Sequence, residues 1–457
     1  MPSVTDSLRL ERVLPADAAE LIDAWLAPER LARWLHLMPD LPPRRAEADA
    51  NGFELEYALQ PQGTVTLRGR CRERKPARRL VYDLETVSPL RTSHSQVTFE
   101  VVPGGGTTTV RLCHDGLDAE QRSQAESVWR HALGLLVAAC PRALDAYFGR
   151  FTRASGYRSP FGGFWPDAED FEARLARKRA DGELDADDEA RFRTWQRDGF
   201  VRLERAVPTA VVDALRAEIA ADWQRGNPDV TVELNDGSNR FPRMEPQFEH
   251  VPHKVLDYHA VSANARAVQF AAPIRRFLAQ LFERPPMAFQ SLLFRYGTEQ
   301  DMHQDTAYVV VRSPMQFVGV WVALEDIAEG TGELLYYGGS HHIPEFLWLG
   351  RGRACPPGYD DHRAFLAWVR DESERRGCPL LRFHPKKGDA LVWHADLVHG
   401  GSKRVLRDRT RWSLVTHYCP VDVDPEWMAR TAHSGRLEHE PGAFHCHALR
   451  GGGGAAP

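Results

Sequence analysis

Residues 299–313 read EQDMHQDTAYVVVRS, a run of strand-forming residues that begins with a histidine and a carboxylate. Tyr308 and the valines that follow it favour a β-strand. Residues i and i+2 of a strand point to the same face, so His303 and Asp305 are expected to project together. An imidazole and a carboxylate side by side are two ligands for a metal ion. The triplet alone also fits an ordinary ion pair at a strand end, so the rest of the chain has to decide.

The composition is typical of a globular protein, with 43% hydrophobic and 26% charged residues. A length of 457 residues predicts two to three domains. The net charge of -5 and the lack of a basic block argue against a nucleic-acid partner. The seven cysteines are scattered and form no CxxC pair, which favours a reducing compartment. No signal peptide or apolar stretch of the ~20 residues needed to span a bilayer is recognised. We therefore expect a cytoplasmic protein, and the sequence does not predict its oligomeric state.

The first domain is expected over residues 1–150, and its pattern is a helix, an antiparallel sheet and a long closing helix. The helices are predicted at 17–35 and 118–148, the second bent at Pro141. Alternating apolar residues predict strands at 65–71, 80–84, 96–102 and 107–112.

Residues 8–150 resemble the SRPBCC (START-like) superfamily, and within it the Aha1-like branch. The resemblance is carried by WLAPERLARWL (25–35), GTVTLRGRCRERKPARRLVYDLE (63–85) and QVTFEVVPGGGTTTVRLCHDGL (96–117). It implies a helix-grip fold that holds an apolar ligand or binds a protein partner. No residue of this domain is predicted to be catalytic, and His114 and Asp115 are interpreted as turn residues.

Residues 151–185 are interpreted as a linker and lead-in helix, in which Phe161, Phe164 and Trp165 are expected to dock the two domains together. Helices are predicted near 167–181 and 186–198. Short strands with glycine-rich turns then predict a jelly roll or barrel, at 317–324, 333–337, 380–383, 390–393 and 411–418. The segment 421–457 is rich in histidine, at His433, His439, His445 and His447. This spacing fits no standard zinc pattern, so a tail or lid is the preferred interpretation.

His399 lies at a late strand end and is the candidate third ligand. Two histidines and one carboxylate on one face of a metal are the arrangement of non-haem Fe(II) oxygenases. Arg411 begins the next strand, and its planar guanidinium suits a carboxylate such as that of 2-oxoglutarate.

Rival residues were weighed for each of these roles. His394 and Asp396 form a second HxD triplet but lack a strand of their own. Arg409 competes with Arg411 on the same strand face, and His341 with His342 is interpreted as part of a turn that shapes the pocket.

Residues 186–420 resemble the phytanoyl-CoA dioxygenase (PhyH) family of Fe(II)/2-oxoglutarate oxygenases. The matching segments are RDGFVRL (197–203), SLLFRYG (291–297), MHQD (302–305), VGVWVALED (318–326), GTGELLYYGGSHH (330–342), KGDALVWHADLVHGGS (387–402) and RDRTRWSLVTHY (407–418). The implied fold class is α+β: the helix-grip domain is followed by a double-stranded β-helix (jelly roll, cupin-like) with flanking helices.

This resemblance also implies the site and its cofactors. His303, Asp305 and His399 correspond to the Fe(II) ligands, and Arg411 to the 2-oxoglutarate arginine. The same motifs offer further cosubstrate contacts at Tyr296, Trp321 and Ser340. The chain departs from the family at Thr331-Gly332, where Asn-Gly is usual, and at Tyr296, where Lys is frequent.

The implied activity uses O2 to hydroxylate, desaturate, epoxidise or cyclise an unactivated carbon of a small-molecule or acyl substrate, for example in secondary metabolism. Two alternatives stay open. One is a ligand- or partner-binding protein with an inactive oxygenase fold, and the other is a zinc hydrolase that uses the same three ligands.

Overall fold

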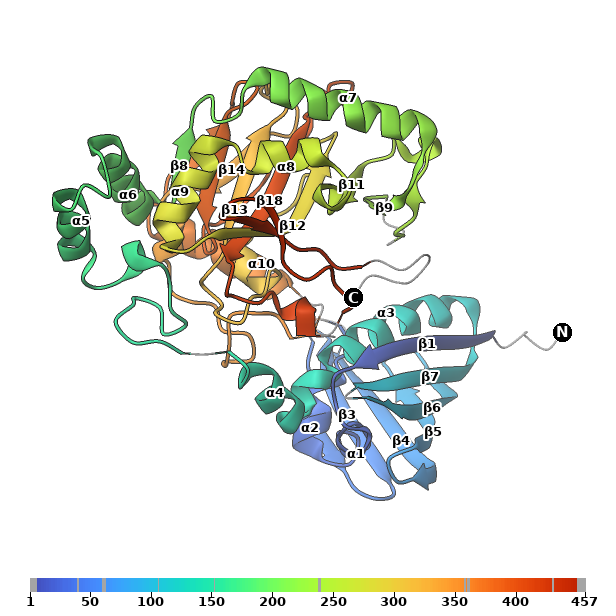
Figure 1. Cartoon of the computed structure of the whole chain (residues 1–457). Coiled ribbons are helices and arrows are strands. Elements are labelled where there is room, and N and C mark those ends of the chain that lie inside the picture. The colour runs from blue at the N-terminus through green and yellow to red at the C-terminus, as the bar shows by residue number, and fades with distance from the viewer. Residues whose placement is uncertain are drawn as a thin grey trace. The chain divides into compact units, whose positions relative to one another are not determined.

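The computed structural model describes residues 6–38, 41–59, 63–105, 107–151, 153–236, 240–356, 359, 362–429 and 431–449 (Figure 1). The contacts within the chain divide it into two units. The first unit comprises the described residues of Met1–Arg150 together with Leu347–Ala364, and the second comprises those of Phe151–Phe346 and Phe365–Pro457. The segment Leu347–Ala364 is thus an excursion that packs as part of the first unit, and the sequence patterns did not predict it.

The first unit is built on a seven-stranded antiparallel sheet in the order β1-β7-β6-β5-β4-β3-β2. Its strands are β1 (Asp6–Leu14), β2 (Arg45–Ala48), β3 (Gly52–Leu59), β4 (Gly63–Lys75), β5 (Arg79–Val87), β6 (Thr92–Gly104) and β7 (Thr107–Leu117). Its helices are α1 (Ala18–Asp23), α2 (Pro28–Trp34), α3 (Ala119–Leu135) and α4 (Pro141–Phe148), with the 3-10 turn η1 (Leu136–Ala139) between the last two. The long α3 runs along the sheet in Figure 1.

Two predicted helices of this unit are each broken in the structure. The helix expected at 17–35 ends at Asp23, and a second one starts at Pro28, where proline suits the first helical position because its missing N–H needs no partner there. The helix expected at 118–148 is interrupted by η1 and restarts at Pro141 for the same reason. Trp25 centres the core, stacked on Tyr82 with ring centroids 5.2 Å apart.

The second unit contains a ten-stranded and a three-stranded sheet. The large sheet runs β10-β9-β11-β12-β18-β13-β16-β8, with β20 on β12 and β19 on β20, and the small sheet runs β15-β14-β17. The large sheet comprises β8 (Phe200–Leu203), β9 (Asn227–Leu234), β10 (Arg243–Met244), β11 (His253–Leu256), β12 (Pro286–Phe294), β13 (Val318–Ala323), β16 (Ala390–His394), β18 (Ser413–Pro420), β19 (Leu437–Glu440) and β20 (Ala443–His445). The small sheet comprises β14 (Leu334–Tyr337), β15 (Leu380–Phe383) and β17 (His399–Gly401).

In the described part of the second unit, the helices α5 to α10 accompany these sheets, as Figure 1 shows. They are α5 (Phe171–Ala180), α6 (Ala186–Asp198), α7 (Thr209–Arg225), α8 (Ala263–Gln269), α9 (Ala272–Phe282) and α10 (Arg363–Arg375). The short 3-10 turns are η2 (Trp165–Asp167), η3 (Pro246–Phe248), η4 (Tyr258–Ala260), η5 (Asp305–Ala307), η6 (Ser340–His342) and η7 (Glu426–Ala429). A mixed helix and sheet architecture, the coarser part of the predicted fold class, is therefore confirmed.

Two of the three aromatic residues expected to dock the two domains, Phe164 and Trp165, pack inside the second unit. Phe164 stacks on Phe282 with centroids 4.8 Å apart, and Trp165 donates its indole N–H to the carbonyl oxygen of Gln280 at 3.0 Å. Both side chains lie in the unit's main hydrophobic core. The docking prediction was wrong for these two residues because α6 and α9 offer them apolar partners within their own unit.

Candidate metal centre

The two candidate histidines of the metal site come from segments that pair through their backbones. His303 and His399 exchange both backbone hydrogen bonds, each at 2.9 Å, although they lie far apart in the sequence. The strand predicted to follow Asp305 does not form, because Asp305–Ala307 is the 3-10 turn η5. His303 and Asp305 still face the same way, since Gln304 between them is extended with φ -108° and ψ 136°.

Both imidazoles are oriented by the carbonyl oxygen two residues earlier. The Nδ1 of His303 lies 2.7 Å from the oxygen of Asp301, and the Nδ1 of His399 lies 2.9 Å from that of Leu397. Nδ1 must be the protonated nitrogen to donate to a carbonyl, so Nε2 keeps its lone pair. Such an outer hydrogen bond is how proteins orient metal-binding histidines.

The Asp305 carboxylate completes the group of three. Its Oδ1 lies 3.6 Å from the Nε2 of His303 and 3.6 Å from the Nε2 of His399. The three ligand atoms all lie within 4.8 Å of one another, and each of the three residues is at most 6% exposed. Two imidazole nitrogens and one carboxylate oxygen in a buried cluster fit one divalent metal ion, and the set matches that of non-haem iron enzymes.

The second carboxylate oxygen is held by groups that sequence reasoning missed. Trp393 donates its indole N–H to Oδ2 of Asp305 at 2.8 Å, and the Nε2 of His417 lies 3.4 Å from the same oxygen. Gly319 faces Trp393 across the β13–β16 pair, and a Cβ there would come within 2.2 Å of the indole ring. Glycine is therefore what leaves room for this indole. His417 could have been predicted from its strand. Alternate residues of a strand share one face, so His417 is expected on the same face as Arg411, together with Ser413 and Val415.

Electrostatics keep these groups in their metal-binding forms. Burial acts to raise the pKa of Asp305, but His399, His303 and His417 more than offset it, so this pKa lies well below its usual range. Burial lowers the pKa of His399 to about 4, so this imidazole is neutral near pH 7.

Arg411 lies in the same cavity as the three ligands, and that cavity has a volume of about 510 Å³. The cavity lies between the two sheets, with walls from β12, β13, β16 and β18 of the large sheet and from β14 and β17 of the small one. Arg411 is 4% exposed and donates to the hydroxyl of Ser413 at 2.7 Å, whereas its Nε finds no partner among the described residues. Burial lowers its pKa to about 10, so it stays charged at neutral pH. A buried guanidinium with spare donors is suited to an anion.

Of the other predicted cosubstrate contacts, only Trp321 lines this cavity. The guanidinium of Arg411 lies 5.5 Å from the Trp321 ring centroid. Tyr296 is not among the lining residues, and its ring faces the guanidinium of Arg404 at 4.5 Å. Ser340 is also absent from the lining, because its hydroxyl is fully buried and accepts the backbone N–H of Val398 at 2.8 Å. Neither Tyr296 nor Ser340 therefore lies in the wall of the cavity that holds Arg411.

The rival residues lie outside the cavity lining. Asp396 donates its backbone N–H to the Nδ1 of His394 at 3.0 Å, and the other ring nitrogen of His394 is 3.6 Å from Asp167. Arg409 is exposed. His341 and His342 form the turn η6, and both rings contact the carbonyl oxygen of Gln196.

The first unit has a cavity of its own, about 590 Å³ in volume and lined mainly by apolar side chains such as Leu35, Leu67 and Leu84. His114 lies in its wall on β7, and not in the predicted turn. Trp129 donates its indole N–H to the Nδ1 of His114 at 2.9 Å, and the Nε2 of His114 lies 2.8 Å from the hydroxyl of Ser95. Among the described residues no helix is long and apolar enough to cross a bilayer.

The predicted resemblances are confirmed by comparison with family models. Residues 195–407 match the model described as Phytanoyl-CoA dioxygenase (PhyH). Residues 15–140 match the model described as Activator of Hsp90 ATPase homolog 1-like protein.

Two curated relatives carry the name Phytanoyl-CoA dioxygenase domain-containing protein 1. The Bos taurus protein is 28% identical over 186 residues, which are 40% of this chain and 56% of the relative. The Danio rerio protein is 25% identical over 166 residues, which are 36% of this chain and 50% of the relative. The chain thus spans about half the length of the curated relatives it matches.

Similar solved structures include a carbocyclase, an epimerase and the protein EctD. The α-ketoglutarate dependent carbocyclase SnoK from nogalamycin biosynthesis has a TM-score of 0.40 and 17% identity, covering 58% of this chain and 98% of that one. The epimerase SnoN from the same biosynthesis has a TM-score of 0.39 and 17% identity, covering 61% and 100%. EctD from S. alaskensis with bound Fe has a TM-score of 0.38 and 20% identity, covering 56% and 79%.

Trp393→Phe should weaken divalent metal binding, because it removes the N–H that holds Oδ2 of Asp305. Loss of such an outer contact costs roughly 10- to 100-fold in metal affinity, and His417 on the same oxygen predicts the lower end of that range. Anaerobic titration with Fe(II) measures the change, with Trp368→Phe on α10 as the matched control. An unchanged affinity in Trp393→Phe would show that the indole does not position the carboxylate.

His114 should make the first unit less stable in acid. Burial lowers its pKa from the ordinary 6.5 to about 4, with Asp115 opposing the shift. Between these two values the unfolded chain binds a proton that the folded unit does not, so stability falls as the pH drops through this window. Hydrogen exchange of the β6 and β7 amides between pH 7 and 4 measures it. His114→Asn should remove part of the pH dependence, and an identical profile in that variant would contradict the assignment.

Proposed function

We propose that this chain, whose residues 195–407 match the PhyH family model, is an Fe(II)- and 2-oxoglutarate-dependent dioxygenase. The observation that carries the proposal is the buried group of His303, Asp305 and His399 in one cavity with the buried Arg411. A metal site alone would fit several enzyme classes. A metal site that shares its cavity with a buried, under-bonded guanidinium fits an anionic cosubstrate as well.

The three ligands would hold Fe(II), and Arg411 would hold the distal carboxylate of 2-oxoglutarate. Iron, 2-oxoglutarate and O2 supply together the oxidising chemistry that no side chain can provide. The chain itself contributes binding, orientation and exclusion of water. Asp305 brings a permanent negative charge, and the carbonyl-bonded imidazoles present Nε2 without having to reorient.

The Arg411 side chain is held by its neighbours in a conformation that can bind a carboxylate. Ser413 fixes one end of its fork, and the rings of Phe294 and Trp321 lie 5.5 Å from its central carbon. A guanidinium held this way loses little rotamer freedom on binding. Its remaining N–H groups then satisfy the two oxygens of a carboxylate.

The substrate class we propose is a small molecule or acyl group that is hydroxylated, desaturated, epoxidised or cyclised at an unactivated carbon. The cavity next to the ligands has Leu292, Leu334 and Val309 in its wall, which suits a largely apolar reacting part.

The architecture we propose for the two units is a helix grip in the first and a double-stranded β-helix in the second. The sheet order with α3, and the two sheets on either side of the iron cavity, support these names. We propose that the apolar cavity of the first unit holds an apolar ligand, with His114 and Ser95 as its polar wall. The scattered cysteines, which form no CxxC pair, support a reducing cytoplasmic location.

Formation of succinate from 2-oxoglutarate under Fe(II) and O2 tests the proposal. We expect it in the wild type, and expect it to be lost in Asp305→Ala with the fold intact, since these ligands are not part of a hydrophobic core. Absence of Fe(II)-dependent succinate in the wild type would favour the inactive binding protein. Ester or amide hydrolysis with Zn²⁺ would favour a hydrolase.

Arg411→Ala should raise the KM for 2-oxoglutarate far more than Arg409→Ala. A hydrogen bond to a charged group contributes ~1.5–3 kcal/mol, which corresponds to roughly ten- to a hundredfold in KM. Arg409 is exposed and lies outside the cavity, so it is the matched control. Steady-state succinate formation over a range of 2-oxoglutarate concentrations gives both values, and a larger effect at Arg409 would reverse the assignment.

A further inference from the structure

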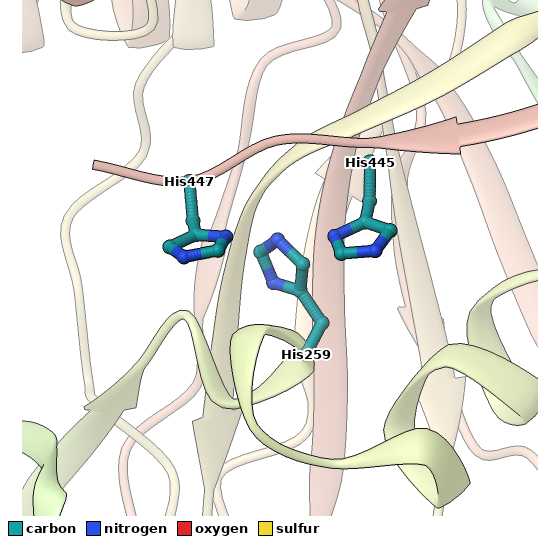
Figure 2. A group of neighbouring side chains, drawn as sticks. All are labelled: His259, His445 and His447. Carbon is teal, nitrogen blue, oxygen red and sulfur yellow. The ribbon is translucent and has the colours of Figure 1, made fainter. Parts of the chain in front are cut away.

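Three histidines that are distant in the sequence gather at the C-terminal hairpin of the second unit (Figure 2). His259 lies in η4, His445 ends β20, and His447 follows two residues later. Each offers one ring nitrogen, and the three nitrogens lie within 4.8 Å of one another. Figure 2 shows the rings of His445 and His447 on either side of the His259 ring. The spacing of the C-terminal histidines did not predict this group, because the third residue, His259, lies far upstream in the sequence.

The hydrogen bonds of these rings leave two buried nitrogens without a partner. The Nδ1 atoms of His445 and His447 are both buried and bond to nothing among the described residues. The Nδ1 of His259 lies 2.7 Å from the hydroxyl of Ser291, and its Nε2 lies 3.1 Å from the carbonyl oxygen of Cys446. A buried polar atom without a hydrogen-bond partner destabilises the fold. Two of them facing a third imidazole therefore call for a shared partner.

Burial keeps all three rings neutral. Burial lowers the pKa of His445 to about 3, with His259, Arg266 and His447 acting in the same direction. Burial also lowers the pKa of His259 and of His447. Neutral imidazole is the form that binds a metal, so no proton has to leave at neutral pH. The nearby positive charge of Arg266 opposes the binding of a cation. The Asp257 carboxylate, which accepts the backbone N–H of Ser291 at 3.0 Å, favours the binding of a cation.

We propose that His259, His445 and His447 bind one divalent transition-metal ion of the zinc class, separate from the iron centre. The ligand atoms are the two unpartnered Nδ1 atoms and the Nε2 of His259, which gives up its contact with Cys446. The Nδ1–H of His259 then donates to Ser291, an outer hydrogen bond of the kind that orients metal-binding histidines. Three imidazoles suit zinc and leave a fourth position for water, and His447 is only half-buried on that side.

The ion fastens the C-terminal hairpin to the large sheet. Strand β20 has three residues and pairs with β12 only at Met287 and Ala288, which is a short ladder. His259 belongs to the body of the unit, whereas His445 and His447 belong to the hairpin. A metal bound by all three therefore crosslinks the hairpin to the segment that follows β11.

The cluster and the iron cavity lie on opposite faces of β12. Gln290 lines the iron cavity and contacts His417, whereas the next residue, Ser291, contacts His259. Successive side chains of a strand point to opposite faces. Each site can therefore be emptied by substitution without removing a ligand of the other.

Zinc stoichiometry in full-length variants tests the proposal. The His303→Ala/His399→Ala variant, stripped with a chelator and dialysed against Zn²⁺, should retain one equivalent by elemental analysis. Adding His445→Ala and His447→Ala should abolish that equivalent, whereas adding His439→Ala, a histidine of the same hairpin, should leave it. Ser291→Ala should weaken Zn²⁺ binding roughly 10- to 100-fold. No bound zinc in the first variant, or full retention without His445 and His447, would overturn the proposal.

A second measurement needs no substitution in the cluster, so it stands if those variants misfold. Zn²⁺ added to the His303→Ala/His399→Ala variant should slow hydrogen exchange of the amides in residues 437–449 at least tenfold. The control is the β4 and β5 amides of the first unit, which should not change. Equal exchange of the hairpin with and without Zn²⁺ would show that no ion crosslinks it.

Discussion

The candidate metal centre of the second unit depends on one electrostatic constraint, the buried carboxylate of Asp305 between two imidazoles. An ionised Asp305 without compensation would be strongly disfavoured in the interior. The structure compensates it at Oδ2 with the indole N–H of Trp393 and the ring of His417. The proposed metal ion, held between Oδ1 and the Nε2 atoms of His303 and His399, would compensate the other oxygen. Trp393, His417 and His399 lie on segments distant from Asp305 in the sequence, so the buried carboxylate is compensated only when both sheets are in place.

The same constraint explains the layout of the cavity. Backbone pairing between His303 and His399 brings an early segment onto β17 of the small sheet, while Trp393 and His417 approach from the large sheet. Arg411 then adds a positive charge to a site that already holds a negative one. The cluster of His259, His445 and His447 on the opposite face of β12 differs from this site, because it has three imidazoles and no carboxylate. That difference fits the proposed Fe(II) at the first site and the proposed zinc-class ion at the second.

The sequence predicted elements whose signal is local and missed those that depend on distant partners. Strand β15 lies at the predicted residues 380–383, and β16 extends the predicted one by a single residue, because alternation and flanking turns define both. The valines after Tyr308 have strand propensity but pair only through an isolated bridge at Val311, so no strand forms. The ligand triplet could be predicted because an HxD pair and a late strand-end histidine leave a recognisable pattern. The contacts of Trp393 and the place of His259 beside His445 could not, since only the folded chain brings those residues together.

The central claim is that one metal ion and one 2-oxoglutarate bind in the cavity as neighbours, which makes their affinities interdependent. Anaerobic calorimetric titration of 2-oxoglutarate into the chelator-stripped protein, with and without Fe(II), tests this directly. Because coupling between two bound ligands is reciprocal, we predict that Fe(II) strengthens 2-oxoglutarate binding by at least about tenfold. In the Asp305→Ala variant Fe(II) should have little effect. Equal affinity for 2-oxoglutarate in the wild type with and without Fe(II) would contradict the account.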